Sequence, residues 1–257
     1  MCLILFSYNC HPVHRLVLLA NRDEFYDRPT ANAHYWEEDP TILGGKDLKH
    51  GGTWLGITKS GKIAAITNFR DPSNRKEDAP SRGFLVSDFL KNSYTPSEYF
   101  NRIKSKIYLY NDFNLLLGDR QSLCCISSHT MSFDVLPAGV YGLSNHLLNT
   151  TWPKVRHGLD DLVSELKDGS EANLNTLFKI LADKTIPEDE FLPDTGVGLE
   201  WERILSPIFI TSPTYGTRSS TLLLIDYENK ATLMERNYDP IDSAIFTDQE
   251  FKLTLDD

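Results

Sequence analysis

The pattern of apolar and polar residues predicts that the N-terminal third of the chain is mostly strand. Residues 3–8 and 16–20 are apolar runs separated by turn-forming residues, which is typical of a hairpin. A second pair of runs, residues 53–58 and 63–67, flanks Gly61, which suits a turn that needs a positive φ. We therefore expect two hairpins before residue 70.

Helical periodicity follows this strand-rich region. Apolar residues recur at helical spacing between residues 81 and 107, where Thr95-Pro96-Ser97-Glu98 has the order of a capped helix start. Residues 155–166 and 174–181 predict two further helices, the first with a clear apolar face. Further strands are predicted at residues 114–117, 123–127, 140–143, 208–211, 219–226 and 231–235.

Strands thus occur in runs that are separated by runs of helices. Such segregation favours an α+β fold over a doubly wound fold, in which single strands and helices alternate. The sequence predicts a four-layer αββα sandwich, with two antiparallel sheets packed between helices. No linker rich in proline, glycine or serine divides it, so we expect a single domain over residues 1–257. The acidic stretch at residues 188–202 is expected to form a long loop that covers a cleft or decorates the surface.

Charge and composition exclude several classes of partner. The formal net charge is −10, whereas nucleic-acid binding depends on clustered lysine and arginine. The same acidity disfavours stable contact with anionic membranes, and an anionic small ligand would need a local basic pocket. Neither a signal peptide nor a membrane span is evident, and four cysteines form no dense disulfide framework, so we expect a cytoplasmic protein with reduced thiols.

Cys2 is the most informative candidate for chemistry. Removal of Met1 would leave a thiol and a free α-amine on the same residue. An α-amine has an unperturbed pKa of about 7.7 to 8, so it can take the thiol proton near neutral pH. The commoner meaning of such a cysteine is a small apolar residue at the start of a buried strand.

Four polar residues, Asn21, Arg22, Asp23 and Glu24, follow the second apolar run. Asp23 could bind the α-amine of Cys2, and Arg22 could hold a thiolate or a ligand carboxylate through its fork of donors. A strand that leaves the core into a solvated turn is the commoner meaning of such a run.

The string from Asn21 to Glu24, followed by Phe25-Tyr26-Asp27-Arg28-Pro29, resembles the signature of the NRDE family, also called the transport and Golgi organisation two family. That family resembles the N-terminal-nucleophile hydrolases, in particular the group containing penicillin V acylase and bile salt hydrolase. The resemblance implies the same αββα sandwich. Further blocks that carry it are Gly51-Gly52-Thr53-Trp54-Leu55-Gly56, Thr67-Asn68-Phe69-Arg70, Gly142-Leu143-Ser144-Asn145 and Thr217-Arg218-Ser219-Ser220.

The resemblance also implies roles for individual residues, with one departure. Ala20 stands where the acylases place an arginine, and Arg22, on the same face of a regular strand, is the candidate substitute. By motif, Cys2 would be the nucleophile, and Asp23 would bind its amine. Asn68 and Asn145 would donate to an oxyanion, and Arg218 would orient the catalytic centre.

Three functions are compatible with these residues, and we favour the first. Proteins that resemble this chain have been linked to the movement of haem and to lipid or acyl-coenzyme A homeostasis, and this resemblance implies a carrier. In it Asn21, Arg22, Glu24 and Trp54 would contact the ligand, and Arg22, Arg218 or Lys46 would suit haem propionates. No cofactor is required, because haem would be cargo.

The other two functions belong to different classes. An amidase or acyltransferase would work through an acyl group on Cys2, and an interaction protein in secretory or membrane organisation would act through its surface. No exposed apolar stripe supports the latter. No metal site is expected, since Cys124 and Cys125 point to opposite faces of a strand, and His11 and His14 fit a solvated loop better than a metal or haem iron. No oligomeric state is predicted.

Overall fold

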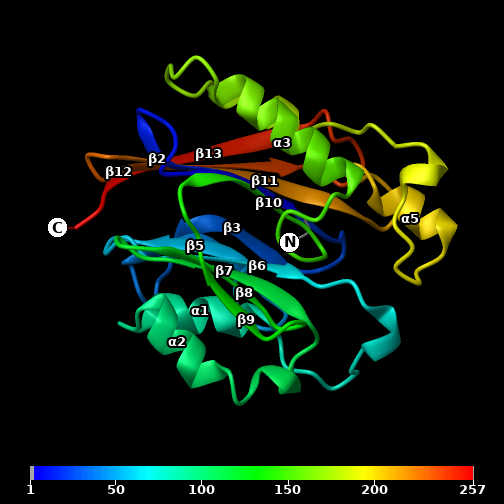
Figure 1. Ribbon diagram of the computed structural model, residues 1–257, viewed down its shortest axis with the longest axis horizontal. Coiled ribbons are helices and arrows are strands. Elements are labelled where there is room, and N and C mark those ends of the chain that lie inside the picture. The colour runs from blue at the N-terminus through cyan, green and yellow to red at the C-terminus, as the bar shows by residue number, and fades with distance from the viewer. Residues whose placement is uncertain (1–2, 257) are drawn as a thin grey trace.

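Two antiparallel sheets lie face to face in the computed structural model, which describes residues 3–256 (Figure 1). The first sheet has the order β10-β1-β2-β11-β12-β13 and the second β3-β4-β5-β6-β7-β8-β9. The strands of the first sheet are β10 (Gly139–Leu143), β1 (Leu3–Tyr8), β2 (His14–Phe25), β11 (Tyr215–Asp226), β12 (Lys230–Tyr238) and β13 (Phe246–Thr254). Those of the second are β3 (Thr30–Tyr35), β4 (Ile42–Asp47), β5 (Leu55–Thr58), β6 (Ile63–Asn68), β7 (Phe113–Gly118), β8 (Leu123–Ser127) and β9 (Ser132–Val135).

Helices cover the outer face of each sheet (Figure 1). The helices α3 (Pro153–Leu166) and α4 (Leu174–Leu181) pack on β1, β2, β10 and β11. On the other side, α1 (Gly83–Lys91) and α2 (Pro96–Ile103) pack on the second sheet. A short helix, α5 (Leu199–Leu205), lies at one end of the layers. The predicted αββα sandwich is confirmed.

The side chains of β2 alternate between the two hydrophobic cores of the molecule. Leu16, Leu18 and Ala20 point into the core between the sheets, whereas Val17 and Leu19 point into the core under α3 and α4. Successive side chains of a strand face opposite sides, so a continuous apolar run is what a strand buried on both faces requires. The same alternation decides where the polar residues that follow will point.

Local signals in the sequence predicted most of these elements correctly. Gly61 has a φ of +83° in the turn between β5 and β6. The hydroxyl of Thr95 accepts from the amide of Glu98, and the Glu98 carboxylate accepts from the amide of Thr95, which is the expected capping box. The helix over residues 174–181 has the predicted bounds.

The strand predicted at residues 208–211 is wrong. Its backbone is bonded mainly outside any ladder: the carbonyl of Ile208 accepts from the side chain of Asn21, and the amide of Ile210 donates to the hydroxyl of Thr217. Buried polar side chains therefore take the place of a neighbouring strand. The sequence pattern did not predict the strands β3, β4, β9 and β13 or the helix α5.

The expectation that His11 and His14 lie in a solvated loop is also wrong. Their side chains stack with ring centroids 5.3 Å apart, and the residues are 3% and 5% exposed. Nδ1 of His11 accepts from the backbone amides of Val13 and His14, which closes the turn between β1 and β2. Burial lowers the pKa of His14, and the nearby carboxylate of Glu171 opposes this effect.

Across residues 3–256, no helix has the length and apolarity needed to span a membrane.

Candidate functional site

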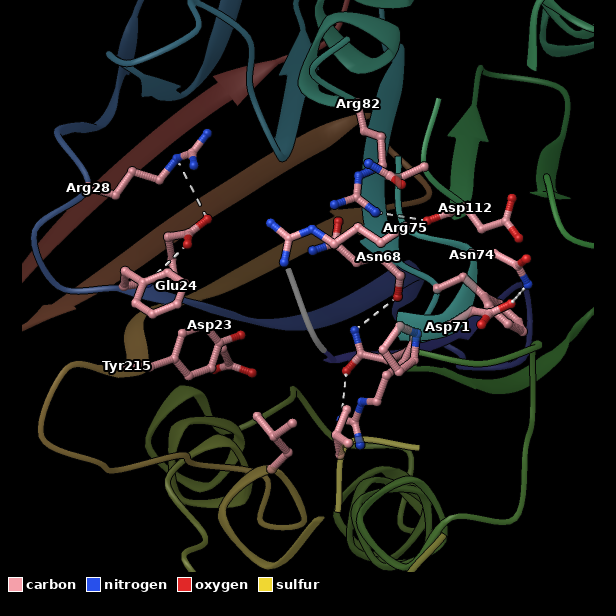
Figure 2. A pocket seen from close by; sticks show the side chains of 18 of the residues that line it. Asp23, Glu24, Arg28, Asn68, Asp71, Asn74, Arg75, Arg82, Asp112 and Tyr215 are labelled. Carbon is pink, nitrogen blue, oxygen red and sulfur yellow. Dashed lines mark hydrogen bonds and ion pairs between the residues drawn. The ribbon is translucent and has the colours of Figure 1, made fainter. Parts of the chain in front are cut away.

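A cavity of about 530 Å³ lies where the ends of both sheets meet (Figure 2). Asp23 and Glu24 at the end of β2 line one side, together with Tyr215 at the start of β11. Asn68 at the end of β6 and Asn145 just after β10 line another side. The cavity therefore gathers four of the predicted site residues from segments far apart in the chain.

The lining of this cavity is rich in charge. Its apolar part is formed by Phe25, Phe69, Pro72, Val197, Leu205 and Tyr215. Four carboxylates also face it: Asp23, Glu24, Asp71 and Asp112. Its five cationic side chains are Arg28, Lys49, Arg70, Arg75 and Arg82. The five cations thus slightly outnumber the four carboxylates, in a chain whose net charge is −10.

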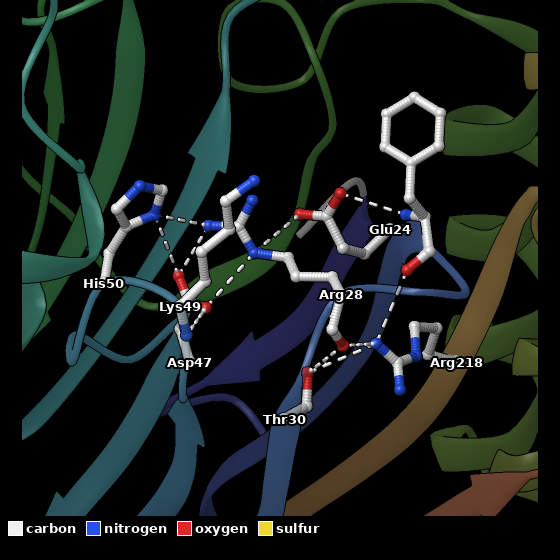
Figure 3. Close-up of polar contacts among 8 residues, drawn as sticks. Glu24, Arg28, Thr30, Asp47, Lys49, His50 and Arg218 are labelled. Atoms are coloured by element: carbon white, nitrogen blue, oxygen red, sulfur yellow. Dashed lines mark hydrogen bonds and ion pairs between the residues drawn. The ribbon is translucent and has the colours of Figure 1, made fainter.

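Two of these cations are held by carboxylates outside the lining. Arg28 binds Asp47 through two nitrogens, at 3.2 and 2.6 Å, and Figure 3 shows this pair beside Glu24 and His50. Burial would raise the pKa of Asp47, but the hydrogen bonds and charge of Arg28 hold it below its ordinary value. The other pair joins Arg70 to Glu202 at 2.8 Å.

Lys49 and Arg75 differ from these two arginines. Both side chains are exposed, and neither makes a hydrogen bond or ion pair with its charged group to any residue of the described part of the chain. They lie in separate segments, one between β4 and β5 and the other between β6 and α1. They are therefore the cations of the lining that are available to a ligand.

Asn68 and Asn145 are brought together across the two sheets. The Nδ2 atom of Asn145 donates to the carbonyl of Asn68 at 2.9 Å, and the amide of Arg70 donates to the carbonyl of Asn145 at 2.8 Å. Asn145 is 5% exposed, so its amide group is fixed rather than solvated. One N–H of this side chain is thus engaged by Asn68.

Asp23 lies at the same end of the first sheet, and it is 5% exposed. Its Oδ1 atom accepts from the hydroxyl of Thr217 at 2.6 Å, and this hydroxyl in turn accepts from the amide of Ile210. Cys2, the predicted nucleophile, lies outside the described residues. Leu3, the next residue in the chain, pairs with Asn21 on β2.

Asn21 points away from the cavity, toward the helices. It is fully buried, and its Nδ2 atom donates to the carbonyls of Leu181 and Ile208 at 2.8 and 2.9 Å. Its Oδ1 atom accepts from the hydroxyl of Ser220 at 2.6 Å. Asn21 therefore ties β2 to the end of α4, to the segment after α5 and to β11.

Arg22 faces the space between the sheets, as its position relative to Ala20 predicts. Its guanidinium stacks on Trp54, 4.1 Å from the ring centroid, and the residue is 5% exposed. Within residues 3–256 it makes no hydrogen bond or ion pair, and burial lowers its pKa to about 10. On its other side Trp54 packs on Gly45, where a Cβ would lie 2.3 Å from the ring. Neither Arg22 nor Trp54 lines the cavity directly.

Arg218 anchors the connection from β2 to β3 (Figure 3). Its NH1 nitrogen donates to the carbonyls of Phe25 and Arg28, and to the hydroxyl of Thr30 at 3.2 Å. It lies at an irregularity in the pairing of β11 with β2, and burial lowers its pKa. It stands outside the lining of the cavity.

Comparison with known proteins shows which family the chain belongs to. A family model described as Transport and Golgi organisation 2 matches residues 1–240. The chain belongs to this family. A mouse protein named Transport and Golgi organization 2 homolog is 34% identical, covering 99% of both chains. A Drosophila melanogaster protein, Transport and Golgi organization protein 2, is 29% identical and covers 94% of both.

Among solved structures, the chain is similar to a Caenorhabditis elegans ortholog of N-acylethanolamine-hydrolyzing acid amidase. The TM-score is 0.50 at 13% identity, covering 87% of this chain and 92% of the other. At this identity the likeness shows the fold alone. The chain thus has the fold of the N-terminal-nucleophile hydrolases, as the resemblance implied.

Arg70 and Glu202 are members of the site that sequence reasoning missed. Arg70 is the last residue of the motif block Thr67 to Arg70, but its ion pair with Glu202 joins residues that are distant in the sequence. Glu202 is one acid among many in a stretch predicted to be a loop, and nothing in the local sequence marks it as buried.

One group in the described part of the chain has the composition of a metal site. The side chains of Asp71, Asp112 and His129 each offer one ligand atom, and these atoms lie within 4.8 Å of one another. His129 is exposed, and Asp112 already accepts from Ser128 and contacts His129. We assign no metal to it.

Proposed function

We propose that this protein is a carrier of an anionic, partly apolar small molecule, with haem as the first candidate cargo and a lipid or acyl-coenzyme A as the second. The cavity beside the Asn21 to Glu24 string would hold the ligand. The observation that carries this proposal is the presence of Lys49 and Arg75 in the lining of that cavity, where their charged groups have no partner among the described residues of an otherwise acidic chain.

The charges of the lining suit such a ligand. Lys49 and Arg75 are available to carboxylate or phosphate groups, which arginine recognises through its planar fork of donors. Arg22 lies on the same face of β2 as Glu24, which lines the cavity, so its buried charge adds to the positive potential there. Phe25, Phe69 and Tyr215 offer apolar surface for the rest of the ligand.

The size of the cavity is also in the range of small-molecule sites, which are typically about 300 to 1,000 Å³. Haem combines two propionates with a wide apolar ring, and an acyl-coenzyme A combines phosphates with an apolar chain. Both therefore match the two kinds of surface in the lining.

Titration of the full chain with haemin and with a panel of acyl-coenzyme A compounds tests the proposal. We expect saturable binding at one equivalent, seen for haemin as a Soret shift, and we expect it to persist in Cys2→Ala, since a carrier needs no nucleophile. Absence of saturable binding by every one of these ligands would overturn the proposal.

An amidase or acyltransferase is the second candidate, favoured by the likeness in fold to an amidase ortholog and by the pair Asn68 and Asn145. The α-amine of Cys2 would take the thiol proton, and the thiolate would attack an amide carbonyl. The C–N bond would break as the α-ammonium returns this proton to the leaving amine, and the resulting thioester would pass its acyl group to water or to another amine, which regenerates the thiol. Removal of one oxyanion donor typically costs about a hundredfold to a thousandfold in rate.

This second candidate has a sharp requirement. The intact mass must show loss of Met1, and a thiol-reactive acyl probe must label Cys2 in preference to the other cysteines. Burial raises the pKa of Cys124, and raises that of Cys125 to about 12, so both should react slowly. Cys10 is exposed and gives the internal control. Retention of Met1 in active protein, or labelling of Cys10 alone, would contradict the enzyme.

A further inference from the structure

Arg70 joins four parts of the molecule at the edge of the cavity. It follows β6 in the second sheet, and its backbone amide donates to Asn145, which follows β10 in the first sheet. Its guanidinium donates to Oδ1 of Asn145 at 3.4 Å and lies 5.0 Å from the ring centroid of Trp152, at the start of α3. The fourth part is reached through Glu202, on α5.

Glu202 uses both of its oxygens. Oε2 accepts from Arg70 at 2.8 Å, while Oε1 accepts from the amide and the hydroxyl of Thr195, at 2.8 and 2.6 Å. The side chain of Glu202 is 4% exposed and that of Arg70 is 11% exposed. The pair is therefore largely desolvated, and loss of one charge would leave the other without compensation.

The helix α5 buries a charged side chain rather than an apolar one against the rest of the molecule. Glu202 is the single buried residue among its seven, all of which the structure describes. Leu199 and Trp201 are 50% and 43% exposed, so they contribute little apolar packing. Segments with few buried apolar contacts belong to the low-stability end of a protein and open locally.

The segment that carries Glu202 is a wall of the cavity. Val197 and Leu205 both line it, one on each side of Glu202 in the chain. Because Thr195 also binds Glu202, this carboxylate connects two points of residues 195–205 to Arg70 at the cavity edge. At the far end of the segment, Nζ of Lys154 on α3 donates to the carbonyl of Leu205 at 2.8 Å.

We propose that Glu202 is the latch of this wall and a positioning residue for the cavity. Its ion pair with Arg70 holds residues 195–205 closed and orients Asn145, and a ligand enters and leaves when the pair opens. The inference rests on the proposed function only in taking this cavity as the ligand site.

Hydrogen exchange on the full chain, with Glu202→Gln, tests the latch without any ligand. Glutamine keeps the shape and an acceptor for Thr195 but removes the charge that binds Arg70. We expect amides in residues 195–205 to exchange at least tenfold faster, with little change in β1 and β2. Glu200→Gln, an exposed position on the same helix, is the matched control and should leave exchange unchanged. Glu202→Asp, which keeps the charge, should restore much of the protection.

Stopped-flow binding of haemin supplies the second measurement. We expect both the association and the dissociation rates to rise in Glu202→Gln, whereas simple loss of folded protein would lower the bound amplitude without raising them. Equal exchange in Glu202→Gln and Glu200→Gln, faster exchange throughout the chain, or unchanged haemin rates would each overturn the latch. If wild type binds no haemin, haem is excluded as the cargo in the proposed function. The hydrogen-exchange data alone then decide whether the Arg70–Glu202 pair holds residues 195–205 closed.

Discussion

Replacement of Asn21 by alanine is expected to lower the free energy of unfolding by about 3 to 5 kcal/mol, because several buried polar groups lose their partner at once. The carbonyls of Leu181 and Ile208 both accept from this one side chain, and the hydroxyl of Ser220 donates to it while keeping Tyr238 as a second partner. Each buried polar group left unsatisfied costs about 1 to 3 kcal/mol. Asn21→Asp should be at least as damaging, since it turns a donor toward two carbonyls into an acceptor.

Chemical denaturation of the purified variants measures this effect. Asn101→Ala, an exposed position on α2, is the control and should change stability by less than about 0.5 kcal/mol. A loss below about 1 kcal/mol in Asn21→Ala would contradict the role assigned to Asn21. The first residue of the family string would then matter for some other reason than tying β2 to α4.

Arg22→Met is expected to leave the folded state as stable as wild type, or more stable by about 1 kcal/mol, while weakening ligand binding about tenfold. Arg22 is a buried cation that makes no hydrogen bond or ion pair within residues 3–256, and its stacking on Trp54 can be replaced by an apolar side chain of similar length. Loss of its charge, however, lowers the positive potential of the cavity.

Arg28→Met gives the contrasting control. It removes the partner of Asp47, which is 8% exposed, so it should destabilise the protein by about 2 to 3 kcal/mol. Unfolding midpoints and titrations with haemin or palmitoyl-coenzyme A would be measured for both variants. Equal destabilisation by the two substitutions, or unchanged affinity in Arg22→Met, would contradict a ligand-directed role for Arg22.

The fold could be predicted largely from the sequence because its main signals are local. Strand alternation, the capping box at Thr95 and the turn glycine Gly61 each depend on residues close in the chain. The edge strand β13 was missed because its first residues are all exposed, and only Phe251 and Leu253 alternate with polar residues near its end. The segment at 208–211 was misjudged because its backbone bonds to the side chains of Asn21 and Thr217 in place of a neighbouring strand, which its own apolar pattern cannot reveal.

The roles proposed for the site residues stay predictions, but the structure shows where these residues lie. Asp23, Glu24, Asn68 and Asn145, which belong to the motif blocks, line one cavity because each lies at or just after a strand end at the same end of the sheets. Their local patterns could not reveal that Asn21 faces the helices, or that Arg218 binds carbonyls of the turn after β2. Such roles depend on sheet pairing between residues nearly 200 positions apart, which a single sequence does not encode in any short window.

The central claim is that Lys49 and Arg75 in the lining of the cavity bind an anionic ligand, and charge reversal at these two positions tests it most directly. Titration of haemin or palmitoyl-coenzyme A would compare wild type with Lys49→Glu/Arg75→Glu and with a control, Lys167→Glu/Lys179→Glu, that makes the same charge change at exposed helix positions. We expect at least about a tenfold loss of affinity in the first variant alone, with the difference shrinking as salt screens the charges. Equal affinities in the two variants would contradict the account.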